Sequence, residues 1–459
     1  MKDDYYHQRF QEIVEADAEL YAEEFREELW PALLDSSVRY HGSPVKFVYT
    51  PYIIGLEQWR FYRSFIKTFV GIANNVIEEY LHNPSFRELF PFSSEMEEYI
   101  LLDPGYDSNF PVARFDILFD GEGNIKFCEL NTDGTSAMNE VRVMQEILAK
   151  SKAVKKLCRQ EDISLYGFEL FRSWINILLD KYRQFAPGYR MRPTVAIVDF
   201  ATDGVKSEFQ QFKRFMEEWG LKALIVDPRE LEYDGERLFY EDMEIDLIYR
   251  RATTARIFEH LEEVGDLLAA YKNRDVCVCG GFRSQILHNK AIFQVLYDYE
   301  NLDFLSAGER SFLERYILPT GPVKEEIIEG EKIINDKDDY ILKPCDSFAG
   351  KGIKLGRKCR PDEWRSSLEE ACEESYLYQE FCRPGTIDLF TAAEEKIGFE
   401  PYHFTLGFYL YDEELKGLYN RAGRYDIIGS DYECVTVPSY VAASENTAVR
   451  DLCEEVKYG

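Results

Sequence analysis

A predicted β-hairpin between residues 113 and 131 restricts the fold of this chain more than any other segment. Its strands are the β-rich runs Ala113–Phe119 and Ile125–Asn131, which flank the sequence DGEGN. Asp, Gly and Asn tolerate the backbone conformations of tight turns, so the residues between the runs favour a short reversal of the chain. We therefore predict an antiparallel strand pair at this position.

One face of this hairpin gathers polar side chains. A loop of the four residues Gly121–Asn124 places Asp116 opposite Glu129 and Arg114 opposite Asn131, all on the same face. Carboxylates that face each other across two strands repel, and a bound divalent cation would remove that repulsion. Magnesium suits this set because it prefers oxygen ligands and combines few protein carboxylates with substrate phosphates. The sequence therefore predicts a Mg²⁺ site at Asp116, Glu129 and Asn131; the alternative is an exposed face solvated by water.

The composition is that of a globular protein, and the net charge limits which kinds of molecule the protein can bind. With 459 residues, 45% hydrophobic and 30% charged, the chain has an ordinary globular composition. A net charge of −30 argues against nucleic acid and against an anionic membrane surface as partners, because both are negatively charged. ATP is compatible with this charge, because a local basic pocket can bind phosphate within an acidic protein.

The sequence shows no mark of secretion, membrane insertion or zinc binding. The start, MKDDYYHQ, has no basic and then apolar segment, and no apolar run approaches the roughly 20 residues that span a bilayer. The ten cysteines are scattered without a CxxC pair, and the six histidines are dispersed. This pattern favours reduced thiols and a cytoplasmic location.

Residues 1–100 are expected to form a helical N-terminal region. Apolar residues recur at helical spacing through the first stretch, which Pro31 and then Ser36–Pro44 are expected to break. A second helical run is predicted from about 56 to 81, ending near Asn83 and Pro84.

Two further regions follow in the sequence. Residues 101–190 contain the hairpin and two predicted helices, at about Thr135–Leu157 and Leu165–Phe185. Residues 191–285 alternate between strands and helices, with the pattern Thr194–Asp199 (strand), Lys206–Trp219 (helix), Ala223–Asp227 (strand) and Asp246–Tyr249 (strand). This β-α-β order predicts a small parallel sheet of nucleotide-binding style. A dinucleotide site is not supported, because no GxGxxG follows the first strand.

Two adjacent arginines follow the third of these strands. Arg250, Arg251 and Thr253 come at its carboxyl end, where open α/β sheets bind ligands. Guanidinium groups there could grip an anionic substrate through forked hydrogen bonds. The alternative is a surface pair bound to neighbouring acids.

The tract DYILKPCDSFAGKGIKLG, residues 339–356, contains a candidate phosphate site. A strand, Tyr340–Lys343, ends in Lys-Pro and leads to a loop with Gly350 and Gly352, then to another short strand. Glycines let backbone N–H groups approach phosphate oxygens, and Lys343 could bridge two phosphates as a point charge. The tract is not GxxxxGK[ST] and no helix follows directly, so it is not a P-loop.

Three other features lie near this tract in the sequence, two before it and one after it. His288-Asn289-Lys290 opens a predicted helix, Ala291–Asp298, and a TGP turn at Thr320–Pro322 lies about thirty residues on. The strand Tyr376–Phe381 carries the sequence YLYQEF. Together these features resemble the ATP-grasp superfamily, in which two lysines and a glycine loop hold ATP phosphates and a Q/E-E-F strand binds adenine.

The order of the motifs resembles one branch of that superfamily. The RFD…ELN hairpin comes about 200 residues before the lysines, whereas it usually follows them. This order is similar to the circularly permuted branch typified by glutathionylspermidine synthase, with R-x-D, E-x-N, KP and a late arginine in succession. The candidate late arginine is Arg421, with Arg424 as second choice. Permutation is tolerated when the original termini lie close together at the surface.

The resemblance implies a fold, a cofactor set and site residues. The expected fold is a mixed α/β (α+β), circularly permuted ATP-grasp fold, with a preATP-grasp Rossmann-like domain at 191–285 and the nucleotide-binding region at 286–459. ATP and Mg²⁺ are the implied cofactors. The implied phosphate and adenine ligands are Lys290, Lys343, Ser347, Gly350, Lys351, Gly352, Gln379, Glu380 and Phe381, and the implied catalytic residues are Arg114 and Arg421.

The resemblance also implies an activity. A carboxylate–amine ligase of this kind transfers the γ-phosphoryl group of ATP to a small-molecule carboxylate, and an amine then attacks the acyl phosphate to form an amide. Positioning and charge neutralisation lower most of the barrier in such transfers. The alternatives are a nucleotide-binding protein without ligase activity that serves a protein partner, and a small-molecule kinase whose product is the acyl phosphate.

Overall fold

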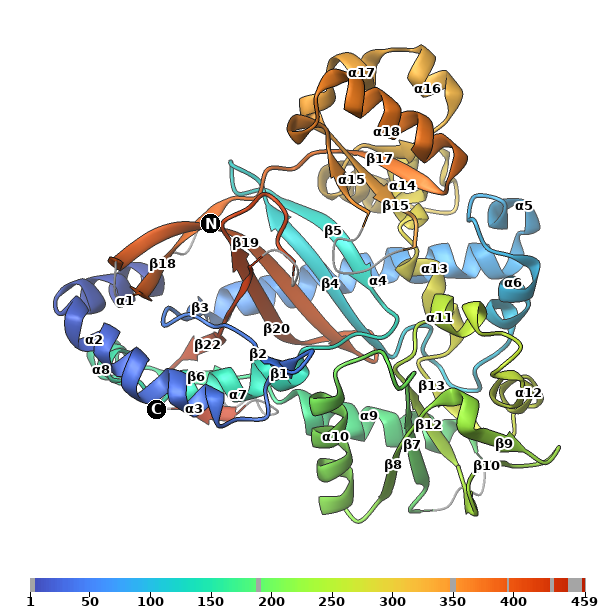
Figure 1. The fold of residues 1–459 in the computed structure, drawn as a ribbon, viewed down its shortest axis with the longest axis horizontal. Helices are drawn as coiled ribbons and strands as arrows, with labels where there is room; N and C mark the ends of the chain where they lie inside the picture. Colours follow the sequence, from blue (N-terminus) through green and yellow to red (C-terminus); the bar gives the residue numbers. More distant parts are fainter. Residues whose placement is uncertain are drawn as a thin grey trace.

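The fold is mixed α/β, as the sequence predicts, and is known from a computed structural model. The structure describes residues 5–186, 191–346, 352–393, 396–429, 433–444 and 456–458. Figure 1 shows a large twisted sheet at the centre, an α/β unit drawn in green below it and a small orange lobe above it. Within the described ranges, no helix is long and apolar enough to cross a membrane.

The large sheet is antiparallel and contains the predicted hairpin. Its strands run in the order β21-β20-β19-β4-β5, with β18 paired to β19. Their bounds are β4 (Val112–Phe119), β5 (Ile125–Asn131), β18 (Thr386–Ala393), β19 (Lys396–Tyr411), β20 (Glu414–Gly423) and β21 (Val435–Val437). The hairpin therefore joins strands that lie almost 300 residues later in the chain (Figure 1).

The register of the hairpin agrees with the prediction, although its loop does not. Asp116 faces Glu129 and Arg114 faces Asn131, but Phe119 pairs with Ile125, so the connection is one residue longer than expected. A β-bulge next to Asp116, which leaves Cys128 unpaired, takes up the extra residue. Without the bulge, the longer loop would shift the carboxylates out of register.

A long helix supports this sheet from behind. Helix α4 (Leu56–His82) agrees closely with the predicted second run and buries one face against the hairpin. The Phe69 ring lies 4.1 Å from the Phe127 ring and 5.4 Å from the Phe115 ring, centroid to centroid. Because Phe115 and Phe127 alternate with the polar residues of the hairpin, the polar face is left pointing to the opposite side of the sheet.

The N-terminal region is mainly helical, as predicted, but it differs from the prediction at Pro31 and in containing short strands. Its helices are α1 (Tyr5–Glu15), α2 (Ala18–Glu24), a π-helical turn (Phe25–Leu29) and α3 (Trp30–Leu34), followed by α5 (Pro84–Arg87) and α6 (Ser94–Leu101). Pro31 does not break the first stretch as expected. It sits in the first turn of α3, where a missing N–H is tolerated. The chain also forms short strands here, β1 (Arg39–Tyr40), β2 (Ser43–Pro44) and β3 (Tyr52–Gly55).

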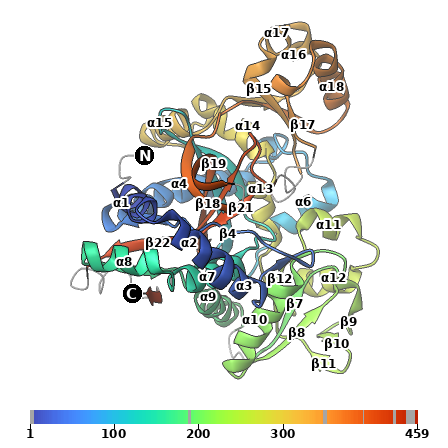
Figure 2. The same ribbon diagram turned by 60° about the vertical axis from the view of Figure 1, so that its left-hand side comes forward.

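The predicted helix at 135–157 is two helices. They are α7 (Met138–Leu148) and α8 (Lys152–Glu161), and the Ser151 side chain caps the second. The residues expected to begin the next helix form a strand instead, β6 (Ser164–Gly167), before α9 (Leu170–Phe185). This strand joins a second sheet of order β23-β6-β22-β3, with β22 (Ser439–Ala443) and β23 (Val456–Tyr458). Figure 2 shows α1 to α3 beside α8 and β22, away from the small lobe.

The Rossmann-like unit contains the predicted parallel sheet. Its strands lie in the order β13-β12-β7-β8 and all pair in parallel. Their bounds are β7 (Thr194–Val198), β8 (Lys222–Val226), β12 (Leu247–Arg250) and β13 (Cys277–Cys279), with helices α10 (Lys206–Glu218), α11 (Thr254–Glu259) and α12 (Gly265–Asn273). The strands β9 (Leu231–Tyr233), β10 (Leu238–Tyr240) and β11 (Met243–Glu244) form an antiparallel addition.

The small lobe (320–346 and 352–380) is built on a sheet of order β14-β17-β15-β16. Its strands are β14 (Thr320–Pro322), β15 (Tyr340–Pro344), β16 (Lys354–Leu355) and β17 (Tyr376–Glu380), and its helices are α16 (Glu325–Glu329), α17 (Lys332–Asn335) and α18 (Pro361–Glu373). The TGP segment is therefore not a turn. It is an edge strand, with Thr320 opposite Gln379.

The nucleotide-binding region predicted at 286–459 contributes to more than one part of the fold. Helices α13 (Gln285–His288), α14 (Ala291–Tyr297) and α15 (Ala307–Tyr316) precede the small lobe. The chain then returns from the lobe to the large sheet at β18 and stays there through β21. The hairpin and the late strands thus form one surface, with the small lobe above it (Figure 1).

Candidate functional site

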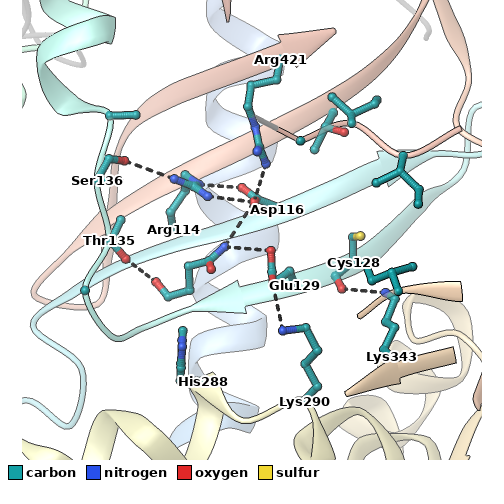
Figure 3. Close-up of a pocket in the computed structure, with 18 of the residues that line it drawn as sticks. Arg114, Asp116, Cys128, Glu129, Thr135, Ser136, His288, Lys290, Lys343 and Arg421 are labelled. Atoms are coloured by element: carbon teal, nitrogen blue, oxygen red, sulfur yellow. Dashed lines mark hydrogen bonds and ion pairs between the residues drawn. The ribbon is translucent and has the colours of Figure 1, made fainter. Parts of the chain in front are cut away.

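A cavity of about 560 Å³ lies where the large sheet, the small lobe and the Rossmann-like unit meet. The hairpin supplies Arg114, Asp116, Cys128, Glu129 and Asn131, and β20 supplies Tyr419 and Arg421. The small lobe contributes Lys343 and Gln379–Phe381, and the segment before α14 contributes His288 and Lys290. Residues that are scattered over 300 positions of the sequence therefore line one space, as Figure 3 shows for its labelled members.

The two predicted catalytic arginines bind the same carboxylate. Arg114 donates from Nε to Asp116 Oδ1 at 2.8 Å and from Nη2 to Oδ2 at 3.1 Å, and Arg421 donates from Nη2 to Oδ2 at 2.8 Å. Both guanidinium groups also lie over the Tyr419 ring, with Cζ 5.3 and 5.6 Å from its centroid. We call Arg114, Asp116, Arg421 and Tyr419 the arginine wall, and Figure 3 labels the first three of these residues.

A glycine on the neighbouring strand makes room for this arrangement. Gly407 of β19 lies opposite Asp116, and a Cβ at this position would come within 2.9 Å of Asp116 Oδ1 and 3.1 Å of Arg114 Cδ. Any larger residue would push the Arg114–Asp116 pair out of place. The sequence analysis did not identify this requirement, because a lone glycine in a strand has no distinctive signal.

The second carboxylate of the hairpin is bound by a lysine. Lys290 Nζ lies 3.0 Å from Glu129 Oε1 and comes from the residue that precedes α14 (Figure 3). Burial by itself raises the pKa of Glu129, but the charges of Lys290, Lys343 and Arg114 outweigh it and bring the pKa to about 2. Glu129 is therefore anionic at any physiological pH.

Lys343 reaches the hairpin from the small lobe. Its Nζ donates to Gln379 Oε1 at 2.8 Å and to the Cys128 carbonyl at 3.4 Å. Gln379 in turn donates from Nε2 to Thr320 Oγ1 at 2.8 Å. The Gln379 amide is thus engaged on both sides, and in this structure it positions Lys343.

The donor set of the hairpin fits a magnesium ion that brings further oxygen ligands with it. Asn131 Nδ2 stands between the carboxylates, 3.2 Å from Asp116 Oδ2 and 3.4 Å from Glu129 Oε2. Turning the amide would place Oδ1 there and give three converging protein oxygens, the type Mg²⁺ prefers. In the described part of the chain, no group of three or more His, Cys, Asp or Glu side chains could hold a metal. The cation would therefore need phosphate oxygens to complete its shell.

The other predicted nucleotide ligands lie nearer the rim or outside the described residues. Glu380 is exposed at the cavity, and the Phe381 N–H donates to the Asp339 carbonyl at 2.7 Å. Gly352 has a φ of +73°, and a Cβ there would meet Tyr376 Oη at 2.9 Å, so this position requires glycine. Ser347, Gly350 and Lys351 lie outside the described residues.

The geometry separates the two candidates for the late arginine. Arg421 belongs to the arginine wall and lines the cavity. Arg424 is exposed, and its guanidinium pairs with Glu400 and lies over the Tyr402 ring, with Cζ 5.1 Å from the centroid. Arg421 is therefore the arginine that faces the hairpin.

Comparison with known proteins gives a fold. No protein-family model matches the chain, and no curated protein does. Among solved structures, it is similar to a glutathione synthetase-like effector from Globodera pallida in its apo form, with a TM-score of 0.59 and 10% identity. The match covers 93% of this chain and 98% of that chain. The chain has a glutathione synthetase-like fold.

Within this glutathione synthetase-like fold, Arg250 and Arg251 are buried and are not the surface pair that the sequence left open. Arg250 forms an ion pair of 2.8 Å with Asp133 and donates to the Ala252 carbonyl at 2.8 Å. Arg251 lines the cavity, with its Nη1 donating to the Tyr249 hydroxyl at 3.2 Å and its Nη2 3.6 Å from Glu208 Oε1. Arg250 therefore ties loops together, whereas Arg251 lines the cavity with its guanidinium held by Thr135, Tyr249 and Glu208.

Sequence reasoning missed the contribution of the first parallel strand. Asp199 follows β7, and the loop Thr202–Val205 after it lines the cavity. Burial raises the pKa of Asp199 to about 6, against the lowering effect of Arg251. The available signal was the rule that ligands bind at the carboxyl ends of parallel strands, which applies to β7 as well as to β12.

It also missed Glu140, a buried carboxylate that lines the same cavity. Glu140 lies in the first turn of α7, and Oε2 accepts hydrogen bonds from Tyr419 Oη at 2.8 Å and Thr436 Oγ1 at 3.2 Å. No local pattern marks this glutamate, because its partners lie almost 300 residues away.

Proposed function

We propose that this protein is an ATP-dependent carboxylate–amine ligase that forms an amide through an acyl phosphate. The observation that carries the proposal is the charge around the hairpin. Arg114, Lys290 and Lys343 are buried and Arg421 is half-buried, and these four cations surround the two hairpin carboxylates, Asp116 and Glu129. In a chain with a net charge of −30, such a concentration of buried positive charge is suited to a polyanion.

The lysines and the small lobe would bind ATP. Lys290 and Lys343 lie on the same side of the hairpin, because the Lys290 N–H donates to the Cys345 carbonyl at 2.8 Å (Figure 3). Both lysines donate to groups that a phosphate oxygen could replace, Glu129 and Gln379. The covering loop is assigned from the sequence to Ser347–Gly352, and the adenine to the strand end at Gln379–Phe381. Asp116, Glu129 and Asn131 would hold Mg²⁺, which supplies charge neutralisation at the β- and γ-phosphates when bound.

The arginine wall would stabilise the transferring phosphoryl group. An oxygen of the substrate carboxylate forms a bond to the γ-phosphorus while the bond to ADP breaks. Arg114 and Arg421 are held at one end by Asp116 and can turn remaining N–H groups toward the developing negative charge. In the second step the amine nitrogen bonds to the acyl carbon, and inorganic phosphate leaves with the electron pair of the broken C–O bond.

The motif order favours the circularly permuted branch of the ATP-grasp superfamily. The hairpin precedes Lys290 in the chain by about 160 residues, and β19 and β20 return to pair with it only after the small lobe. Glutathionylspermidine synthase-like amide formation is the proposed class of reaction. A small-molecule carboxylate and a small-molecule amine are the proposed substrates.

The test is an ADP-release assay. The purified protein is supplied with Mg·ATP, one acid from a set that includes γ-glutamylcysteine, glutathione and free amino acids, and one amine from glycine, putrescine and spermidine. A ligase releases ADP and phosphate only when both substrates are present. Hydroxylamine is added in a parallel series to trap the acyl phosphate as a hydroxamate.

The outcomes separate the possible activities. Amide formation with stoichiometric ADP supports the ligase. Release of ADP with an acid alone, and accumulation of a hydroxylamine-reactive product, would instead identify a small-molecule kinase. Binding of an ATP analogue without any release of ADP across the set would favour a nucleotide-binding protein without ligase activity.

A further inference from the structure

Glu140 presents one oxygen to the cavity while its other oxygen is held in place. Tyr419 and Thr436 both donate to Oε2, at 2.8 and 3.2 Å. Among the described residues, no hydrogen-bond donor reaches Oε1, although the residue lines the cavity and is 8% exposed. A carboxylate fixed at one oxygen and open at the other is arranged to accept a proton from a bound molecule.

Its position connects it with the place where the acyl phosphate would form. The Tyr419 ring that donates to Glu140 is the same ring that Arg114 and Arg421 cover. Glu140 is therefore adjacent to the arginine wall, at the hydroxyl end of Tyr419. A nucleophile that approaches a carbonyl held at the arginine wall can come from the side of Glu140.

The surroundings of Glu140 make it a suitable base near neutral pH. Burial raises its pKa to about 7, and the negative charge of Glu208 on α10 acts in the same direction, whereas the Tyr419 and Thr436 hydroxyls and Arg421 lower it. Tyr409 of β19 also faces this group. A carboxyl group of this kind is populated in both its protonated and its ionised form near neutral pH, whereas an ordinary glutamate is almost wholly ionised and is a weaker base.

We propose that Glu140 is the general base that removes a proton from the attacking amine. This inference rests on the proposed ligase function. As the amine nitrogen bonds to the acyl carbon, its proton passes to Glu140 Oε1, and the C–O bond to phosphate breaks with its electron pair leaving on phosphate. Glu140 then returns the proton to solvent or to the departing phosphate.

The test compares two nucleophiles in the variant Glu140→Gln. Glutamine keeps an acceptor for Tyr419 and Thr436, so the fold is expected to remain intact. With the acid and alkylamine identified by ADP release, Glu140→Gln is expected to slow amide formation at pH 7 by about a hundredfold or more, since a positioned base contributes about 10²–10⁴. Hydroxylamine is uncharged at neutral pH and needs no base, so hydroxamate formation is expected to stay within about threefold of the unaltered protein.

A second variant tests the role of Glu140 through its pH dependence. The acid limb of the rate of amide formation should follow the ionisation of Glu140, fall below about pH 7 and be absent in Glu140→Gln. Glu208 does not line the cavity but raises the pKa of Glu140, so Glu208→Gln is expected to shift this limb to lower pH while leaving hydroxamate formation unchanged. A structural role for Glu140 would not produce that shift.

The outcomes distinguish failure of this inference from failure of the ligase proposal. Equal loss of amide and hydroxamate formation in Glu140→Gln, or an acid limb that does not move in Glu208→Gln, would overturn the assignment of the base alone. Absence of ADP release by the unaltered protein with every acid and amine would overturn the ligase proposal, and this inference with it.

Discussion

The Rossmann-like unit and the small lobe both border the cavity, but they are attached to the large sheet in different ways. The Rossmann-like unit shares the main hydrophobic core, in which the Trp174 ring of α9 packs on Tyr249 of β12 and Tyr411 of β19 with centroids 5.1 and 5.4 Å apart. The small lobe contributes only Cys345 and Leu377 to that core among its described residues. It has a second core of its own, which consists of Val323, Ile333, Leu342, Trp364, Leu368 and Ala371.

Because of this difference, we expect the two sides of the cavity to differ in how easily they move. The side that carries Arg251, Asp199 and the arginine wall is continuous with the main core, and a continuous core resists local movement. The small lobe touches the hairpin at the cavity through Lys343 and the Cys128 carbonyl, 3.4 Å apart. We therefore expect the lobe to open and unfold more easily than the rest of the molecule.

The largest expected effect on stability comes from replacing one buried tryptophan by alanine in each of the two cores. Trp364→Ala and Trp174→Ala each remove a fully buried tryptophan, which costs about 3–5 kcal/mol. Because the cores differ, Trp364→Ala should raise hydrogen exchange mainly in 320–346 and 352–380, whereas Trp174→Ala should lower the stability of the large sheet and the Rossmann-like unit together. Mass-spectrometric hydrogen exchange checks this, and equal exchange throughout in both variants would remove the distinction.

The next effect concerns nucleotide binding by the small lobe. Lys343→Met is expected to weaken the binding of a non-hydrolysable ATP analogue by about 10- to 100-fold, because a hydrogen bond to a charged group contributes about 1.5–3 kcal/mol. The matched control is Lys354→Met in the same lobe. Lys354 does not line the cavity, and its Nζ lies 2.8 Å from Glu370 Oε2. Calorimetric titration measures both, and similar losses in the two variants would contradict the assignment of Lys343.

A smaller effect is expected in the way the free energy of unfolding depends on pH, because Glu140 ionises differently in the folded and unfolded states. The pKa of Glu140 rises from an ordinary value of 4.5 to about 7 on folding, so the folded state binds the proton more tightly than the unfolded state. Its contribution is fully present below the unfolded pKa and is lost as pH rises through about 7. From pH 5 to 8, the unaltered protein should therefore lose on the order of 2–3 kcal/mol relative to Glu140→Gln. Chemical denaturation at both pH values measures this difference, and parallel pH dependences would exclude the raised pKa.

The smallest effect is expected at the rim. Arg424→Ala removes an exposed pair with Glu400 and should change stability and nucleotide affinity by no more than about 0.5 kcal/mol. By contrast, Arg421→Ala removes a half-buried partner of the buried Asp116 and should abolish detectable amide formation. If turnover instead depends on Arg424, the late arginine has been assigned to the wrong residue.

Much of the cavity wall could be predicted from the sequence because the hairpin is local. Asp116 and Glu129 are thirteen residues apart, and strand alternation alone places them on one face. The loop length was wrong and the register was nevertheless correct, because the bulge at Cys128 compensates for the longer loop. Bulges depend on tertiary packing and leave little trace in sequence patterns.

The pairings between distant segments could not be predicted in the same way. Asp116 of β4 meets Arg421 of β20, and Glu140 of α7 meets Tyr419 of β20, only because the chain packs in three dimensions. Lys343 and Gln379 meet because β15 and β17 pair in the small lobe. In the sequence, Glu140 looks like an ordinary residue of an amphipathic helix. Its role becomes visible only in the fold, where Tyr419 of β20 and Thr436 of β21 donate to it. The order of the motifs in the sequence predicted which residues form the site. The structure then showed which of them contact one another.

The central claim is that the cavity binds Mg·ATP, and one measurement tests it most directly. The purified protein is titrated calorimetrically with a non-hydrolysable ATP analogue in the presence and absence of Mg²⁺. Because Asp116, Glu129 and Asn131 require phosphate oxygens to complete a cation site, we predict saturable binding that Mg²⁺ strengthens and that Asp116→Asn weakens. A folded protein that binds no analogue, or binds it with the same affinity without Mg²⁺ and in the variant, would contradict the account.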